Sequence, residues 1–175
     1  MLKIIGIAVV VLVAGILIYA ATRPDTFGIE RSATIKASPE KIFAHVNELK
    51  AWTAWSPWEK IDPALKRTYS GPQSGKGAAY AWEGNKDVGV GRMEIAESVA
   101  PSKITMKLDF LKPFEAHNTA EFTFVRQGDA TTVTWAMSGP SPYLSKLMGL
   151  VFNMDRMVGG QFETGLANLK SITEK

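Results

Sequence analysis

The chain contains no cysteine, which excludes disulfides, thiol catalysis and cysteine-ligated metals. It has only two histidines, His45 and His117, and neither belongs to a spacing typical of a metal site. A Gly-x-Ser-x-Gly turn is absent, and the glycine-rich stretch 75–79 lacks the spacing of a phosphate-binding loop. The sequence therefore predicts no cofactor and no metal.

Clusters of basic residues are also missing. The 175 residues include 20 Lys and Arg against 17 Asp and Glu, and two of the basic residues, Lys3 and Arg23, flank the apolar N-terminus. The rest of the chain is nearly neutral and has no basic stripe. Since binding to nucleic acid requires such a stripe, we expect no nucleic-acid partner. The sequence leaves the oligomeric state open.

A long hydrophobic run is present once, at residues 4–21, which carry no charge. As a helix this run spans about 27 Å, which is long enough to cross a bilayer. A secretory signal peptide is the rival interpretation, but its apolar core is usually about 7–15 residues long. Cleavage after Ala21 would also place the bulky Tyr19 where a small residue is required. We therefore predict an uncleaved transmembrane anchor at 1–22 and a short linker at 23–26, followed by a folded domain at 27–175.

The charges beside this run bear on the orientation of the anchor. Lys3 and the amino terminus favour an N-terminus on the inside, whereas Arg23 is a competing charge at the other end. On balance they favour a single-pass membrane protein with its domain on the outer side, periplasmic or extracellular.

The first part of the folded domain alternates between apolar and polar residues over 27–37, as a strand does. Ser38 and Pro39 then suit the start of a short helix, and a second helical piece is expected at 48–52. Pro57 and Pro63 are expected to stop any further helix. Six more strands are predicted as an antiparallel meander at 67–70, 78–83, 91–99, 103–111, 115–126 and 130–138.

The C-terminal stretch 141–172 predicts one long, bent helix with an apolar stripe. The stripe comprises Leu144, Leu147, Val151, Met154, Val158, Phe162, Leu166, Leu169 and Ile172. Four glycines within it, at 149, 159, 160 and 165, indicate either close contact with the sheet or a hollow beneath the helix. The fold class is therefore α+β, a curled seven-stranded antiparallel sheet wrapped around a long C-terminal helix, with two short helices after the first strand and one N-terminal transmembrane helix.

This order of elements resembles the helix-grip fold of the SRPBCC superfamily, the START-like or polyketide cyclase/dehydrase group. The resemblance covers about residues 27–172 and rests on the stretches 35–43, 52–58, 131–135 and 165–170. It implies an apolar cavity between sheet and helix that takes lipids, sterols, polyketides or other hydrophobic ligands.

The side chains expected to line this cavity follow from the alternation within each strand and the apolar stripe of the helix, with Met157 added as an adaptable side chain. Their predicted role is ligand binding: Trp82, Phe110, Asn118, Phe122, Trp135, Met137, Met157 and Phe162. Trp52, Trp55 and Trp58 form either a structural plug at one end of the sheet or an aromatic entrance facing the membrane. His117 and Glu121 share the outer face, so no catalytic residue is predicted.

The resulting functional hypothesis is a membrane-anchored protein that binds a hydrophobic small molecule or lipid between sheet and helix. Two alternatives stay open at this point. One is an enzyme similar to polyketide cyclases or dehydratases, and the other is a protein-interaction module similar to Hsp90 activators.

Overall fold

The computed structural model describes residues 1–175, with the exception of the side chain of Leu2. The helices are α1 (Leu2–Ala21), α2 (Pro39–Asn47), α3 (Tyr143–Met148) and α4 (Met154–Thr173), with two 3₁₀ turns, η1 (Leu49–Ala54) and η2 (Pro57–Lys60). The strands are β1 (Thr26–Ile35), β2 (Lys66–Ser70), β3 (Ala79–Glu83), β4 (Val90–Val99), β5 (Lys103–Lys112), β6 (Ala116–Gln127) and β7 (Ala130–Pro140).

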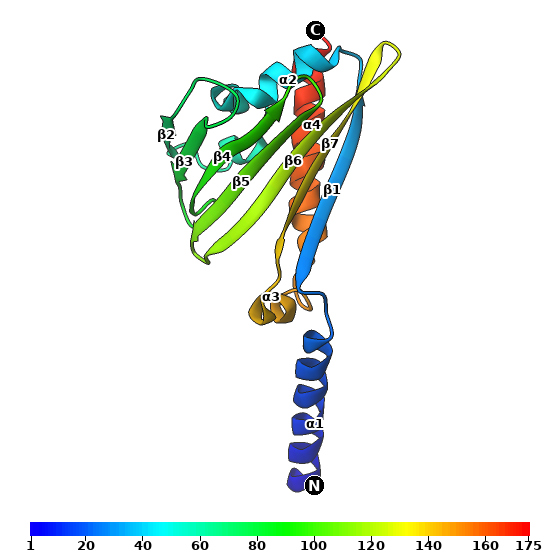
Figure 1. Ribbon diagram of the computed structural model, residues 1–175. Helices are drawn as coiled ribbons and strands as arrows, with labels where there is room; N and C mark the ends of the chain where they lie inside the picture. The colour runs from blue at the N-terminus through cyan, green and yellow to red at the C-terminus, as the bar shows by residue number, and fades with distance from the viewer.

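The seven strands form one antiparallel sheet in the order β1-β7-β6-β5-β4-β3-β2. Six strands follow one another as a meander, and β1 joins the far edge by pairing with β7. Two register shifts in β4 add to the twist of the sheet. The sheet curls around α4, which runs along its concave face (Figure 1). The predicted helix-grip fold is confirmed, and each predicted strand agrees with the structure to within two residues.

The core lies between the concave face of the sheet and α4. Its strand residues are those that alternation placed inward, including Ile104, Met106, Phe124 and Val133. The start of α2 is also as expected, because the Ser38 hydroxyl accepts a hydrogen bond from the backbone N–H of Lys41 at 3.4 Å.

One helical segment was missed. Pro57 and Pro63 were expected to stop helix formation, but Pro57 begins η2. Proline lacks an N–H that the first turn of a helix leaves unpaired in any case, so it suits the start of a helix as well as its end.

The prediction of a single helix over 141–172 was wrong. The chain leaves helical geometry between α3 and α4, and the side chain of Asn153 caps the new helix by accepting a hydrogen bond from the N–H of Arg156 at 2.9 Å. Leu144, Val151 and Met154, all assigned to the buried stripe, are exposed. They precede the part of α4 that lies along the sheet, so they have no strand to pack against (Figure 1).

Two of the helix glycines lie in close contact with the sheet side of the molecule. The backbone at Gly159 lies on the guanidinium group of Arg31, and a Cβ atom added to Gly165 would come within 2.7 Å of the indole of Trp135. Gly160, in contrast, faces open space. Close contact, and not a hollow, therefore explains the glycines at 159 and 165.

Helix α1 extends away from the sheet (Figure 1). Residues 3–21 have a mean hydropathy of 2.9 and are long and apolar enough to cross a membrane, although a signal sequence meets the same criteria. The top of α1 contacts α3, where the hydroxyl of Tyr143 donates a hydrogen bond to the backbone oxygen of Leu17 at 2.9 Å. Lys146 of α3 forms an ion pair with Asp25, just after α1.

Candidate ligand-binding cavity

A cavity of about 180 Å³ lies between the concave face of the sheet, α4 and the 3₁₀ turns. Its walls are formed almost entirely by apolar and aromatic side chains, as in most small-molecule sites. They include Trp52, Trp58, Tyr80, Trp82, Met93, Met106, Leu108, Phe110, Ala120, Trp135, Met137, Val158 and Phe162.

Trp135 of β7 forms the centre of one wall. Its ring stacks on Phe162 of α4 with centroids 4.2 Å apart and an interplanar angle of 9°. On β6, Phe122 stacks on the same indole at 4.8 Å, and Trp58 meets it edge-on at 5.5 Å. Aromatic contacts of this kind each add about 0.5–1.5 kcal/mol beyond simple burial. The wall is therefore fixed in place by helix, sheet and 3₁₀ turn together.

Five of the eight residues predicted to bind ligand line this cavity: Trp82, Phe110, Trp135, Met137 and Phe162. Phe122 is fully buried, packed against the indole of Trp135. That any of them contacts a ligand stays a prediction.

Met157 does not lie in the cavity wall, contrary to its expected position, because its side chain is 59% exposed. Val158 lines the cavity instead. Adjacent residues of a helix point about 100° apart, so choosing Met157 was an error of one position in the helix phase.

Asn118 lies on the inward face of β6, as predicted, but outside the cavity lining. It pairs with Leu108 on one side, and its side-chain oxygen approaches the backbone of Gly139 on the other. That oxygen is buried and has no hydrogen-bond partner among the described residues. The side chain of Asn118 therefore places an unpaired polar atom at the edge of an otherwise apolar surface.

The structure places one carboxylate in the cavity wall that the sequence did not predict. Glu59 of η2 lines the cavity, and its side chain is only 6% exposed. One carboxylate oxygen accepts a hydrogen bond from the hydroxyl of Tyr80 at 2.7 Å, and the other accepts one from Nε of Arg67 at 2.6 Å. Glu59 was not among the residues considered for the cavity from the sequence. The proline at the start of η2 is the signal that could have indicated an ordered turn here.

These three groups form a neutralised cluster. Burial, reinforced by the hydrogen bond to Glu59, raises the pKa of the Tyr80 phenol far above its ordinary value of 10. The hydrogen bond to Glu59 also raises the pKa of Arg67. Tyr80 thus stays neutral and Arg67 charged at all ordinary pH values. Since each carboxylate oxygen of Glu59 already accepts a hydrogen bond, proton transfer between this carboxylate and a ligand competes with the bonds from Tyr80 and Arg67.

Trp52 and Trp55 close the end of the cavity near α2. Both are buried, and their indole N–H groups donate to the backbone oxygens of Val46 and His45 at 2.9 and 3.1 Å. They form the structural plug that was one of the two predicted roles. Trp58 differs, because it is part of the cavity wall beside Phe162.

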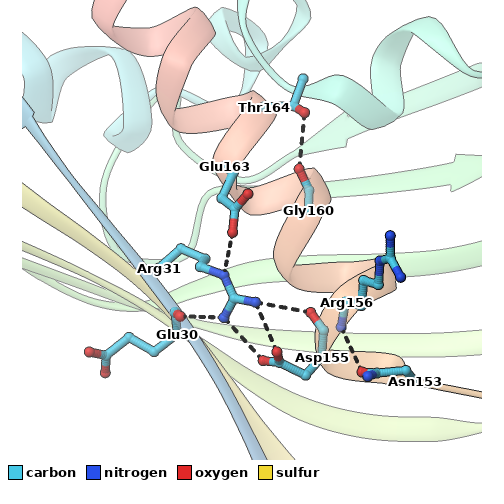
Figure 2. A network of polar contacts seen from close by, with 8 residues as sticks. All are labelled: Glu30, Arg31, Asn153, Asp155, Arg156, Gly160, Glu163 and Thr164. Atoms are coloured by element: carbon cyan, nitrogen blue, oxygen red, sulfur yellow. Dashed lines mark hydrogen bonds and ion pairs between the residues drawn. The ribbon is translucent and has the colours of Figure 1, made fainter.

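Helix α4 is held against β1 by Arg31, as Figure 2 shows. The guanidinium donates to both carboxylate oxygens of Asp155, at 2.9 and 3.0 Å, and to Glu163 at 2.6 Å. The hydrogen bond from Arg31 holds the pKa of Asp155 below its ordinary value of 3.8. These contacts position the first turns of α4 and, with them, Val158 and Phe162 at the cavity.

The cavity reaches the surface at one end of the sheet. Among its lining residues Asp87 is exposed, and Val88, Phe110 and Val158 are partly exposed. They belong to the β3–β4 connection, the end of β5 and the start of α4. Those segments lie at the end of the domain nearest α3 and α1 (Figure 1).

His117 and Glu121 lie on the outer face of the sheet, as predicted. Within the described residues, no group of three or more His, Asp or Glu side chains is arranged to hold a metal ion.

Solved structures with the same fold share little sequence with this chain. A protein from Chromobacterium violaceum is 12% identical, with a TM-score of 0.60, and the match covers 87% of this chain and 99% of that one. The di-domain ARO/CYC protein BexL from the BE-7585A biosynthetic pathway is 15% identical, with a TM-score of 0.64, over 90% of this chain and 53% of that one. Aha1 from Colwellia psychrerythraea is 17% identical, with a TM-score of 0.58, over 85% of this chain and 96% of that one. At these identities the likeness shows the fold alone.

Among proteins with curated descriptions, none matches the sequence. A family model does match, over residues 26–174, which is the whole of the region that the sheet and α4 occupy. The chain therefore belongs to the polyketide cyclase / dehydrase and lipid transport family.

Proposed function

We propose that the protein binds a hydrophobic small molecule or lipid in the cavity between the sheet and α4, and that α1 holds it at a membrane. The observation that carries the proposal is the open space itself, bordered by seven aromatic and several aliphatic side chains where a protein of this size normally packs its core tightly. Water inside a largely apolar cavity finds few hydrogen-bond partners, so an apolar ligand gains contacts without displacing well-bound water.

The volume limits what fits. An engineered apolar cavity of about 150 Å³ in another protein binds benzene. At about 180 Å³, this cavity takes roughly one ring or a short stretch of an acyl chain. A larger ligand must extend through the opening beside Asp87 and Val88, where a polar end of the molecule would meet water.

The membrane part of the proposal rests on α1. Residues 1–22 serve as the anchor, 23–26 as the linker and 27–175 as the binding domain, with the domain on the outer side. The length and hydropathy of α1 support an anchor, and its contact with α3 supports a helix retained in the mature protein.

A cyclase-like enzyme is the second candidate, favoured by one specific observation. The cavity wall carries an ionisable cluster of Glu59, Tyr80 and Arg67, and structures with a similar fold include di-domain ARO/CYC proteins of biosynthetic pathways. Because the cluster satisfies its own hydrogen bonds, it also serves as a purely structural link between η2 and the strands. Binding without catalysis is therefore the primary proposal. An interaction module similar to Hsp90 activators would need no interior space, so the open cavity favours ligand binding over that alternative.

The test uses the full chain in mild detergent and benzene as the probe. Benzene raises the melting temperature if it occupies the cavity, because a ligand that binds only the folded state stabilises it. Ala120→Leu fills the cavity and is expected to abolish that rise. The matched control is Ala136→Leu, which adds the same atoms on the outer face of β7 and is expected to retain it.

Equal stabilisation of the two variants by benzene would contradict the assignment of the cavity. Native mass spectrometry of the full chain, purified from its own host and released from micelles, adds the identity of the ligand. We expect an apolar adduct that Ala120→Leu loses and Ala136→Leu keeps.

A further inference from the structure

Apolar side chains gather at the surface of the segment that joins the sheet to α4. This α3 surface comprises α3, the connection after it and the first turn of α4, and Val151 within it is 79% exposed. Single exposed apolar residues are common on proteins, but a contiguous group marks an interaction surface. Its large exposed apolar residues are Leu144, Met148, Val151, Phe152, Met154 and Met157.

The position of α3 relative to α1 indicates what covers this surface. The hydroxyl of Tyr143 donates to the backbone oxygen of Leu17, which lies inside the apolar run of α1 and four residues before the helix ends. At 1.5 Å per residue, Leu17 is about 6 Å below the end of α1. If α1 crosses a bilayer, α3 therefore begins at the depth of the lipid headgroups, where tyrosine is typically found.

The charges of the α3 surface also favour contact with lipid headgroups. Lys146 is paired with Asp25, and Asp155 is paired with Arg31. The guanidinium of Arg156 makes no hydrogen bond or ion pair among the described residues, which leaves it able to contact lipid phosphates. No unpaired acidic side chain lies in the α3 surface to oppose an anionic headgroup.

We infer that the α3 surface lies in the headgroup region of the bilayer that α1 enters, as an interfacial element beside a transmembrane one. This inference rests on the proposed anchoring by α1. Leu111 and Phe114, both exposed at the β5–β6 turn, lie at the same end of the domain and extend the contact (Figure 1). The opening of the cavity lies at this end too, so a ligand passes between bilayer and cavity over a short path.

The experiment exploits the absence of cysteine, which allows a fluorescent label at one chosen site. Single variants Val151→Cys and Leu144→Cys of the full chain carry the polarity-sensitive dye NBD in phosphatidylcholine/phosphatidylglycerol vesicles. Quenching by doxyl-labelled lipid reports contact with the bilayer, and quenching by iodide reports contact with water. The matched control is Val125→Cys, a similarly exposed valine near the β6–β7 turn at the opposite end. Val10→Cys in α1 reports whether the anchor is inserted.

We expect doxyl quenching at positions 151 and 144 to exceed that at 125 by at least about twofold, with iodide quenching in the reverse order. Quenching at 151 and 144 no greater than at 125, with position 10 quenched, overturns the inference and leaves the anchor standing. Protection of 151 from iodide without doxyl quenching also overturns it, because a protein then covers the surface. An unquenched position 10 refutes anchoring and the present inference together. The benzene test of the cavity is independent of all these outcomes.

Discussion

Gly165 and Gly160 lie in the same helix but in opposite surroundings, so a pair of alanine substitutions tests how α4 packs on the sheet. Replacing glycine by alanine in a helix interior stabilises it by about 0.5–1 kcal/mol, and this gain is shared by both variants. At Gly160 a new Cβ meets nothing within 4 Å. We therefore expect Gly160→Ala to stabilise the protein by roughly that amount.

At Gly165 the new Cβ would lie 2.7 Å from Cζ3 of Trp135 and 3.2 Å from Cδ of Pro57. The indole cannot withdraw easily, because Phe162 and Phe122 stack on it. Overpacking of this kind typically costs about 1–3 kcal/mol. Since helix propensity cancels between the two variants, Gly165→Ala should be less stable than Gly160→Ala by about 1–3 kcal/mol.

The assay is thermal unfolding of the full chain in mild detergent, followed by the near-ultraviolet circular dichroism of the tryptophans. For a protein of this size each kcal/mol corresponds to about 2–4 °C. Trp135→Phe supplies the decisive control, because the smaller ring should relieve the contact and reduce the cost of Gly165→Ala. The reasoning is refuted if both alanine variants melt together, or if the cost at Gly165 is the same in the Trp135→Phe background.

Three other predictions concern charge and the cavity wall. Because Arg31 lowers the folded-state pKa of Asp155, the stability from this pair is fully present above about pH 3.8, the ordinary pKa of the group, and is lost as pH falls through the folded-state pKa. Hydrogen exchange in the first turn of α4, corrected for intrinsic rates, should rise in that range, and in Arg31→Met it should already be fast at neutral pH. The hydrogen bond to Asp109 raises the folded-state pKa of His117 above 6.5. The contribution of this pair to stability is therefore full below pH 6.5 and is lost as pH rises through the folded-state pKa. An NMR titration should show this midpoint, and Asp109→Asn should lower it; an unchanged midpoint contradicts the assigned partner. Trp135→Ala should cost about 3–5 kcal/mol in urea unfolding, because it removes a buried aromatic side chain from the cavity wall, and a cost below about 1 kcal/mol would contradict the central position given to this residue.

The sheet was predictable because each strand obeys one simple rule. Side chains of a half-buried strand alternate between core and solvent, so the positions of Ile104, Met106 and Phe122 follow from spacing alone. The outward position of His117 follows from the same rule. Four cavity residues were found in this way, Trp82, Phe110, Trp135 and Met137, since the inner face of the sheet and the cavity wall are largely the same surface. Phe162 followed from the apolar stripe of the helix.

The break in the last helix could not be predicted from the periodicity of its apolar residues. The apolar spacing continues from Leu144 to Ile172, but whether a helix is buried depends on what lies opposite it, and the sheet ends before α3. An exposed apolar stripe and a buried one have the same pattern. Glu59 was missed for a related reason, because its partners Arg67 and Tyr80 are distant in sequence and only the folded chain brings them together.

Helix α4 is fastened to β1 at both ends. Arg31 holds its first turn, and at the other end Glu174 accepts a hydrogen bond from the backbone N–H of Lys36 at 2.7 Å, while Lys170 donates to the backbone oxygen of Thr34. The helix therefore forms a rigid wall on that side of the cavity. If the cavity widens for a bulky ligand, we expect the opposite wall to move. There the five-residue strands β2 and β3 lie at the free edge of the sheet.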